Sequence, residues 1–156
     1  MVDSEWIRAF LTLFVVLDAM GNVPIFYSLL KNMDRNLRKD VTRRSVVLAS
    51  GILIAFSIFG TSILNYFNIS MGDFKVTSGV VLFLLSLRYF LSGESQSSYG
   101  QGELAVFPLA TPLLAGPGSI SVTILITERL GGPLPALIVI LANSIVSYLI
   151  LVSQDY

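Results

Sequence analysis

Two clusters of helix-breaking and polar residues interrupt the most apolar stretches of this chain. The first reads DAMGNVP at residues 18–24, and the second reads PLATPLLAGPGS at residues 108–119. Glycine lowers helix preference, and proline removes an amide donor and clashes with the preceding turn, so both clusters should unwind a helix. An unwound helix start presents backbone amides and a positive dipole end, which together suit a carboxylate or another anion.

The two predicted helix starts form the candidate substrate site, expected to enclose a polar hollow. Asn22 and Ser119 stand where each second half-helix should begin, and both are good N-caps. The alternative interpretation is that they cap a helix and do nothing more. The neighbouring side chains are small, which leaves room for a small zwitterion. The predicted substrate-binding residues are Asp18, Gly21, Asn22, Val23, Gly116, Gly118, Ser119 and Ile120.

Asp18 is the one carboxylate deep within a predicted span. An unpaired ionised carboxylate in hydrocarbon costs several kcal/mol, so this side chain is expected to be protonated, paired or facing water. One interpretation is functional: Asp18 handles a coupling proton or holds the ammonium group of a substrate. The alternative is a structural acid that is hydrogen-bonded to the broken backbone.

The composition indicates a membrane protein and excludes several classes of enzyme. The 156 residues are 54% hydrophobic and 13% charged, with a mean hydropathy of +0.77, far from the range of soluble domains. With no Cys and no His, the chain offers no thiolate, no histidine-based catalysis and no common zinc site. An aspartyl protease would need a second buried acid. We therefore expect no enzymatic activity, no cofactor and no metal site.

Five apolar stretches are long enough to cross about 30 Å of hydrocarbon as helices. The predicted fold is an all-α transmembrane bundle in which the first and fourth helices are broken. Residues 1–92 form a first repeat of three helices, residues 93–103 a cytoplasmic linker, and residues 104–156 an incomplete second repeat. The predicted spans are residues 9–30, 46–67, 74–91, 104–127 and 133–152.

The basic residues predict the orientation. Six of the ten Lys and Arg residues fall within residues 31–44. Short loops rich in Lys and Arg stay in the cytoplasm, so the loop predicted at residues 31–45 should lie inside the cell membrane and the N-terminus outside. The other predicted inside loop, residues 92–103, contains neither Lys nor Arg and does not support this assignment.

The two clusters occupy matching positions. Gly21 lies ten residues before Lys31, and Gly118 lies ten residues before Glu128. With three spans in the first half, the two broken spans should run in opposite directions. Matched breaks of this kind mark the substrate site of transporters built from inverted repeats. A single break would be better explained as a kink or a packing site, but two matched breaks with an acid favour transport.

Small and polar residues also occur on the second and fifth spans. Because hydroxyl and amide groups bond between membrane helices, we expect these residues to hold helices together by hydrogen bonding and close packing. They are Ser50, Gly51 and Ala55 on the second span and Asn143, Ser144 and Ser147 on the fifth.

Three segments resemble the MarC family of multipass membrane proteins. They read LDAMGNVPIF at residues 17–26, FKVTSGVVLFLLSLRYF at residues 74–90 and VFPLATPLLAGPGSI at residues 106–120. The first has Ala19 where the family signature has a proline, and the third is the most specific. The resemblance implies six spans in two inverted groups of three, so the chain is expected to lack the last span.

The resemblance also implies a function. It is secondary transport of small neutral amino acids such as glycine and alanine across the inner or plasma membrane, coupled to a proton or sodium gradient. The implied partners are the lipid bilayer, a small zwitterionic solute and further copies in an oligomer, with no nucleic acid. The alternatives are a permease for another small solute and a non-transporting protein that packs against a partner in the membrane.

Overall fold

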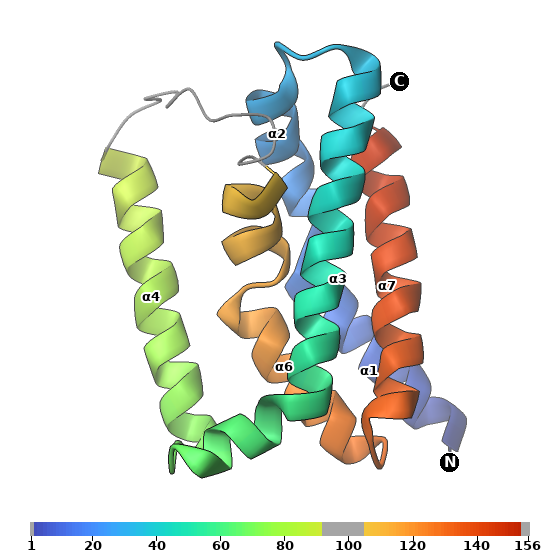
Figure 1. The fold of residues 1–156 in the computed structure, drawn as a ribbon, viewed down its shortest axis with the longest axis vertical. Helices are drawn as coiled ribbons and strands as arrows, with labels where there is room; N and C mark the ends of the chain where they lie inside the picture. The colour runs from blue at the N-terminus through green and yellow to red at the C-terminus, as the bar shows by residue number, and fades with distance from the viewer. Residues whose placement is uncertain (1, 92–104, 154–156) are drawn as a thin grey trace.

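The computed structural model describes residues 2–91 and 105–153, and every regular element in these two ranges is a helix (Figure 1). The predicted all-α class is confirmed for this part of the chain, while the linker predicted at residues 93–103 lies outside it. The elements are α1 (Val2–Leu17), α2 (Ala19–Leu30), α3 (Arg35–Tyr66), α4 (Met71–Leu91), the π-helix η1 (Ala105–Leu114), α6 (Pro117–Arg129) and α7 (Pro133–Ser153).

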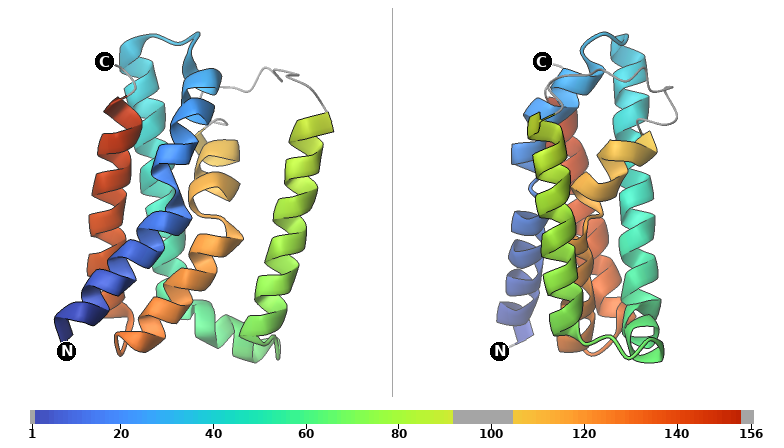
Figure 2. Two further views of the ribbon diagram at one scale, coloured as in Figure 1. Left: turned by 180° about the vertical axis from the view of Figure 1, so that it is seen from behind. Right: turned by 90° about the vertical axis from the view of Figure 1, so that its left-hand side faces the viewer.

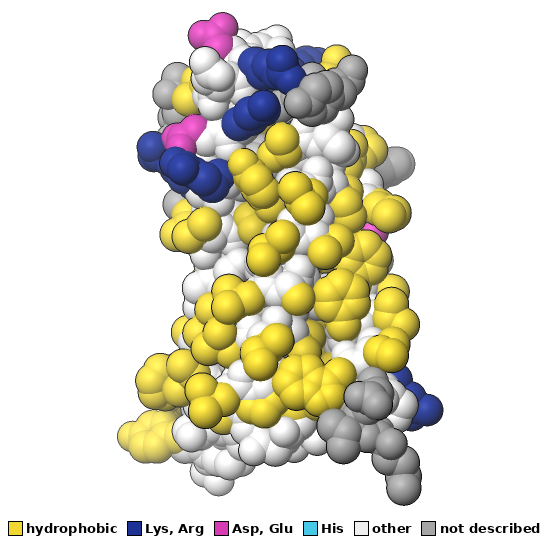
Figure 3. Space-filling model, turned by 90° about the vertical axis from the view of Figure 1, so that its right-hand side faces the viewer, with side chains coloured by type: hydrophobic (Ala, Val, Ile, Leu, Met, Phe, Trp, Pro, Cys, Tyr) yellow, Lys and Arg dark blue, Asp and Glu magenta, His cyan; other side chains and the backbone are white. Residues whose placement is uncertain are grey.

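Within the residues that the structure describes, three helical stretches are long and apolar enough to cross a membrane. They are Ser4–Leu30, which α1 and α2 form together, and the helices α3 and α7. Large apolar side chains face outward: Val15 is 70% exposed and Ile145 is 61% exposed. Figure 3 shows such side chains along the middle of one face, with most of the visible Lys and Arg side chains at one end. This surface suits lipid and would be unfavourable in water. Spanning by α4 and by the η1–α6 pair stays a prediction.

The basic segment is mostly helical, so the loop predicted at residues 31–45 is wrong in extent. Helix α3 begins at Arg35, and its 32 residues reach about 48 Å at 1.5 Å per residue, well beyond the hydrocarbon thickness. Lys and Arg are good helix formers, and Asp40 pairs with both Arg43 and Arg44 at 2.7 Å. The positive charges therefore belong to a helix that continues past the apolar layer.

Helix α3 is the central element of the bundle and contacts α7, η1 and α6. Two hydroxyl pairs join it to its neighbours: Ser50 donates to Ser144 of α7 at 2.6 Å, and the hydroxyls of Ser57 and Thr127 of α6 lie 2.8 Å apart. The hydrogen bonding predicted between the second and fifth spans is thus confirmed for Ser50 and Ser144, whereas the Ser147 hydroxyl is buried with no hydrogen-bond partner among the described residues. The close packing predicted for Gly51 is wrong, because this residue is exposed with open space beside it.

Helix α4 stands at the side of the bundle and contacts α6 (Figure 1). Its start is fixed by a reciprocal pair of bonds: the Ser70 hydroxyl donates to the Asp73 carboxylate at 2.6 Å, and the Asp73 amide donates to the Ser70 hydroxyl at 3.1 Å. The hydroxyl bond, followed by the one from the Ser70 amide, holds the pKa of Asp73 below its usual value. This cap defines where the chain leaves the α3–α4 turn.

The contact between α3 and α6 predicts a difference between two glycine substitutions. A Cβ added to Gly60 would lie 2.7 Å from Cγ1 of Ile124, whereas one added to Gly51 would meet nothing within 4 Å. We expect Gly60→Ala to lower the free energy of unfolding by about 1–3 kcal/mol, because a packed interface must shift. Gly51→Ala on the same helix should be neutral or stabilise by about 0.5–1 kcal/mol. Thermal unfolding in detergent measures both, and equal midpoints would contradict the packing.

Candidate functional site

The first break in the helices is a single residue, Asp18, between α1 and α2. Asp18 adopts the left-handed conformation with φ 45° and ψ 48°, which costs a non-glycine residue about 1–2 kcal/mol. Its Oδ1 accepts a hydrogen bond from the Gly21 amide at 3.1 Å, so the side chain caps α2. A Cβ on Gly21 would overlap the Asp18 carboxylate, and this cap therefore requires a glycine at position 21.

The unwinding predicted across residues 18–24 is much shorter in the structure. Because Asp18 supplies the cap, α2 begins at Ala19, and the rest of the predicted break is helical. This helical part includes Gly21, Asn22, Val23 and Pro24. The predicted position of the break is thus right and its extent is wrong.

Asn22 bridges the first break and is not the N-cap that the sequence predicts. In a continuous helix the Gly21 amide would bond to the Leu17 carbonyl, but here it bonds to Asp18. The Leu17 carbonyl is left to Asn22, whose Nδ2 donates to it at 3.1 Å. Asn22 is only 6% exposed, so this bond satisfies a carbonyl that water does not readily reach.

The second break lies at Ala115 and Gly116, between η1 and α6. Gly116 is extended, with φ −87° and ψ 173°, and forms the N-cap of α6. Pro117 follows at the first helical position, where a missing amide costs nothing. A Cβ on Gly116 would overlap the Pro112 carbonyl oxygen, so the chain can turn this tightly only with glycine.

Ser119 bridges the second break as Asn22 bridges the first. Its hydroxyl is 2.7 Å from the Leu114 carbonyl oxygen and 3.0 Å from that of Gly116, and the residue is 3% exposed. Each bridging side chain thus donates to the carbonyl five residues before it. Ser119 is not the N-cap that the sequence predicts, because Gly116 holds that position.

The two helix starts differ in their capping. The Asp18 side chain caps α2, whereas no side chain caps α6. Since Pro117 has no amide, the first backbone N–H groups of α6 come from Gly118 and Ser119. The start of α6 therefore offers hydrogen-bond donors to an anion, while the start of α2 is already occupied by the Asp18 carboxylate.

The breaks lie beside each other at mid-height, on segments that run in opposite directions (Figure 2). The chain rises through α1 and α2 and descends through η1 and α6 in the orientation of Figure 1. Helices α1 and α6 are in contact, and a Cβ added to Gly118 would lie 3.2 Å from Cγ1 of Val16, two residues before Asp18. The structure thus brings together the two segments that the sequence predicts to form one site.

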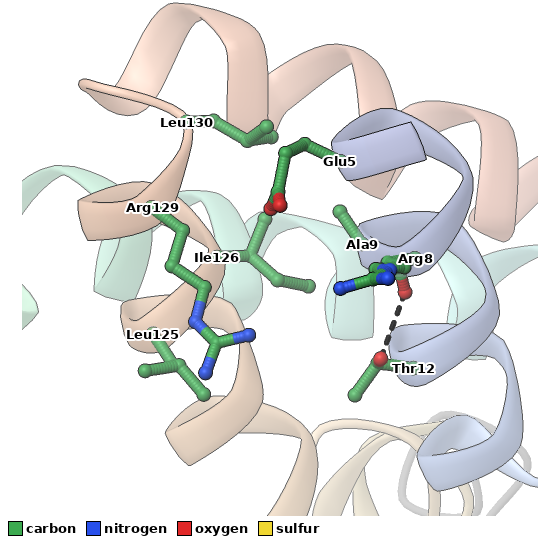
Figure 4. A pocket seen from close by; sticks show the side chains of 8 residues that line it. All are labelled: Glu5, Arg8, Ala9, Thr12, Leu125, Ile126, Arg129 and Leu130. Atoms are coloured by element: carbon green, nitrogen blue, oxygen red, sulfur yellow. Dashed lines mark hydrogen bonds between the residues drawn. The ribbon is translucent and has the colours of Figure 1, made fainter. Parts of the chain in front are cut away.

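Two hollows lie apart from these breaks. One, of about 30 Å³, lies between α1 and α6 towards the N-terminal end (Figure 4). The other, of about 290 Å³, is an apolar groove between α1 and α7 that includes Trp6, Phe10 and Val139. At the breaks themselves Val16 packs against Gly118, so the polar hollow expected there is not one of these two.

Comparison with known proteins supports the resemblance. The family profile described as "MarC family integral membrane protein" matches residues 4–156. A UPF0056 membrane protein of Archaeoglobus fulgidus is 32% identical over 161 residues, covering 98% of this chain and 76% of the relative. Another, of Methanocaldococcus jannaschii, is 35% identical and covers 96% and 78%. No solved structure matches. These names describe membrane proteins and state no substrate.

The bridge across the second break predicts a stability effect. Ser119→Ala removes the donor that satisfies the buried Leu114 carbonyl and should lower the free energy of unfolding by about 1–3 kcal/mol. Ser62→Ala, at an exposed position of α3, is the matched control and should change it by less than about 0.5 kcal/mol. Thermal unfolding in one detergent compares the two. Equal midpoints would mean that the Leu114 carbonyl needs no bridge.

Proposed function

Because the chain belongs to the MarC family of integral membrane proteins, we propose that it is a secondary transporter of small neutral amino acids such as glycine and alanine. The observation that carries this proposal is the contact between two antiparallel broken segments, where Val16 lies against Gly118. Helix ends that meet within the membrane are where transporters built from inverted repeats bind their substrates. In this proposal residues 1–92 and 104–156 belong to two such repeats.

The substrate carboxylate binds at the uncapped start of α6. The amides of Gly118 and Ser119 and the positive end of the helix dipole favour an anion there. The Ser119 hydroxyl is already engaged with two carbonyls, so backbone amides supply the contacts. Val23 and Ile120, which are partly buried and pack against the core, supply the apolar contacts in this proposal. The limited space between the breaks favours a small side chain on the substrate.

Asp18 holds the other end of the substrate or the coupling cation. Its Oδ1 accepts the bond from Gly21, which leaves Oδ2 for an ammonium group or a proton. Protonation would weaken the cap of α2, because a neutral carboxyl is a poorer acceptor than a carboxylate. The state of Asp18 is thereby linked to the geometry of the first break, and hence to movement of one repeat against the other.

Substitution of Asp18 tests this role without removing the cap. Asparagine is a good N-cap and tolerates the left-handed conformation, so Asp18→Asn keeps the break and removes the charge. In proteoliposomes, glycine uptake driven by a pH or sodium gradient should fall about tenfold or more. Asp73→Asn, which changes a carboxylate outside the breaks, should leave uptake near wild type. Undiminished, fully coupled uptake by Asp18→Asn would remove Asp18 from the mechanism.

The proposed orientation can be tested because the 156-residue sequence contains no cysteine. The basic start of α3 should face the cytoplasm and the α3–α4 turn the outside. A membrane-impermeant maleimide should therefore label Tyr66→Cys in intact cells, since Tyr66 is 82% exposed beside that turn. Asn32→Cys, in the turn before α3, should react only after the cells are opened. The reverse pattern would invert the proposed topology.

A further inference from the structure

A second polar site lies between α1 and α6, at the end of the bundle opposite the basic start of α3 (Figures 1 and 4). It is the hollow of about 30 Å³, which has room for roughly two water-sized groups. Three charged side chains line it: Glu5 and Arg8 from α1 and Arg129 from α6. Its other lining residues are Ala9, Thr12, Leu125, Ile126 and Leu130.

The hollow is lined by two guanidinium groups and one carboxylate, so its charged side chains carry a net positive charge. Within residues 2–91 and 105–153, Asp40 pairs with its neighbouring arginines, but no ion pair links Arg8 or Arg129 to a carboxylate. Figure 4 shows both arginines reaching towards the same space from different helices, with Glu5 beside them. Two like charges around one hollow favour a bound anion, and the planar guanidinium matches the two oxygens of a carboxylate. Glu5 adds an acceptor for an ammonium group.

The hollow and the contact between Val16 and Gly118 lie along the same face of α1. Glu5, Thr12 and Val16 follow one another at helical spacing on a single face of α1, and that face meets α6. Thr12 precedes Asp18 by six residues, about 9 Å along the helix axis, and Leu125 follows Gly116 by nine residues, about 14 Å. The charged hollow is therefore about two to three helical turns from both breaks.

We propose that this hollow is a recruitment site for zwitterionic amino acids. Arg8 and Arg129 hold the substrate carboxylate and Glu5 holds its ammonium group, before the substrate passes between α1 and α6 to the breaks. The identity of the ligand rests on the proposed transport function. An oxyanion beside an ammonium group also occurs in the headgroup of phosphatidylethanolamine. The test must therefore distinguish binding of a free amino acid from binding of this lipid headgroup.

Guanidinium NMR signals test the site directly. The protein, labelled with ¹⁵N-arginine, is placed in phosphatidylcholine nanodiscs, and the Arg8 and Arg129 signals are assigned from Arg8→Lys and Arg129→Lys. Glycine should shift both signals saturably and leave Arg43, which is paired with Asp40, unchanged. Glu5→Gln should weaken glycine binding about tenfold, the loss expected for one charge-assisted hydrogen bond. Arg8 and Arg129 signals that do not move with glycine would overturn the proposal.

Two further experiments, one with phosphatidylethanolamine and one measuring glycine uptake, distinguish amino acid binding from lipid binding and from a failure of the proposed transport. If phosphatidylethanolamine shifts the same signals and prevents the response to glycine, the hollow binds headgroups and the recruitment role is wrong. Glycine uptake by wild-type proteoliposomes is measured separately. Arg129→Lys keeps the positive charge but loses the planar guanidinium that donates two hydrogen bonds to a carboxylate, so it should raise KM with little change in Vmax. Uptake with unmoved arginine signals would overturn the recruitment site alone. Shifted signals without uptake would support binding here and overturn the proposed transport.

Discussion

A backbone carbonyl without a partner is expensive in a bundle surrounded by lipid, and each break in this protein creates one. At the first break the Gly21 amide turns to Asp18, and Asn22 takes over the Leu17 carbonyl. At the second break Ser119 serves the Leu114 carbonyl. The helices can therefore be interrupted in their middle without water having to reach the Leu17 and Leu114 carbonyls. The position and shape of the candidate site depend on these two bonds.

The two breaks differ chemically because a side chain caps the start of α2 and no side chain caps the start of α6. The first contains its own anion, because the Asp18 carboxylate occupies the start of α2. The second ends in glycine and proline, which offer no side chain to the start of α6. One break is thus suited to a positive group and the other to a negative group, and Val16 and Gly118 place them in contact. A zwitterion has charges of both kinds at a short separation, which is the basis for proposing amino acids as substrates.

Several errors of prediction trace to interactions that a pattern of residue types does not contain. Gly and Pro located both breaks, but a single left-handed residue with a side-chain cap let α2 start at Ala19 and incorporate Pro24. The charged residues after Lys31 indicated a loop. In the structure a helix begins at Arg35, and within it Arg43 and Arg44 form ion pairs with Asp40. Glu5, Arg8 and Arg129 stand at the ends of apolar stretches, where charges ordinarily only anchor a helix at the interface, so their types and spacing do not indicate that they line one hollow.

The sequence by itself determined the membrane environment, the helical class, the place of each break and the family, because apolar length, proline and glycine act locally and leave a readable pattern. Only the tertiary structure decided how the breaks are satisfied and what lies beside them. The carbonyl that Asn22 or Ser119 serves depends on how sharply the chain turns, and the meeting of Val16 with Gly118 depends on how α1 packs against α6. Contacts between segments about a hundred residues apart arise from that packing, which residue spacing does not encode.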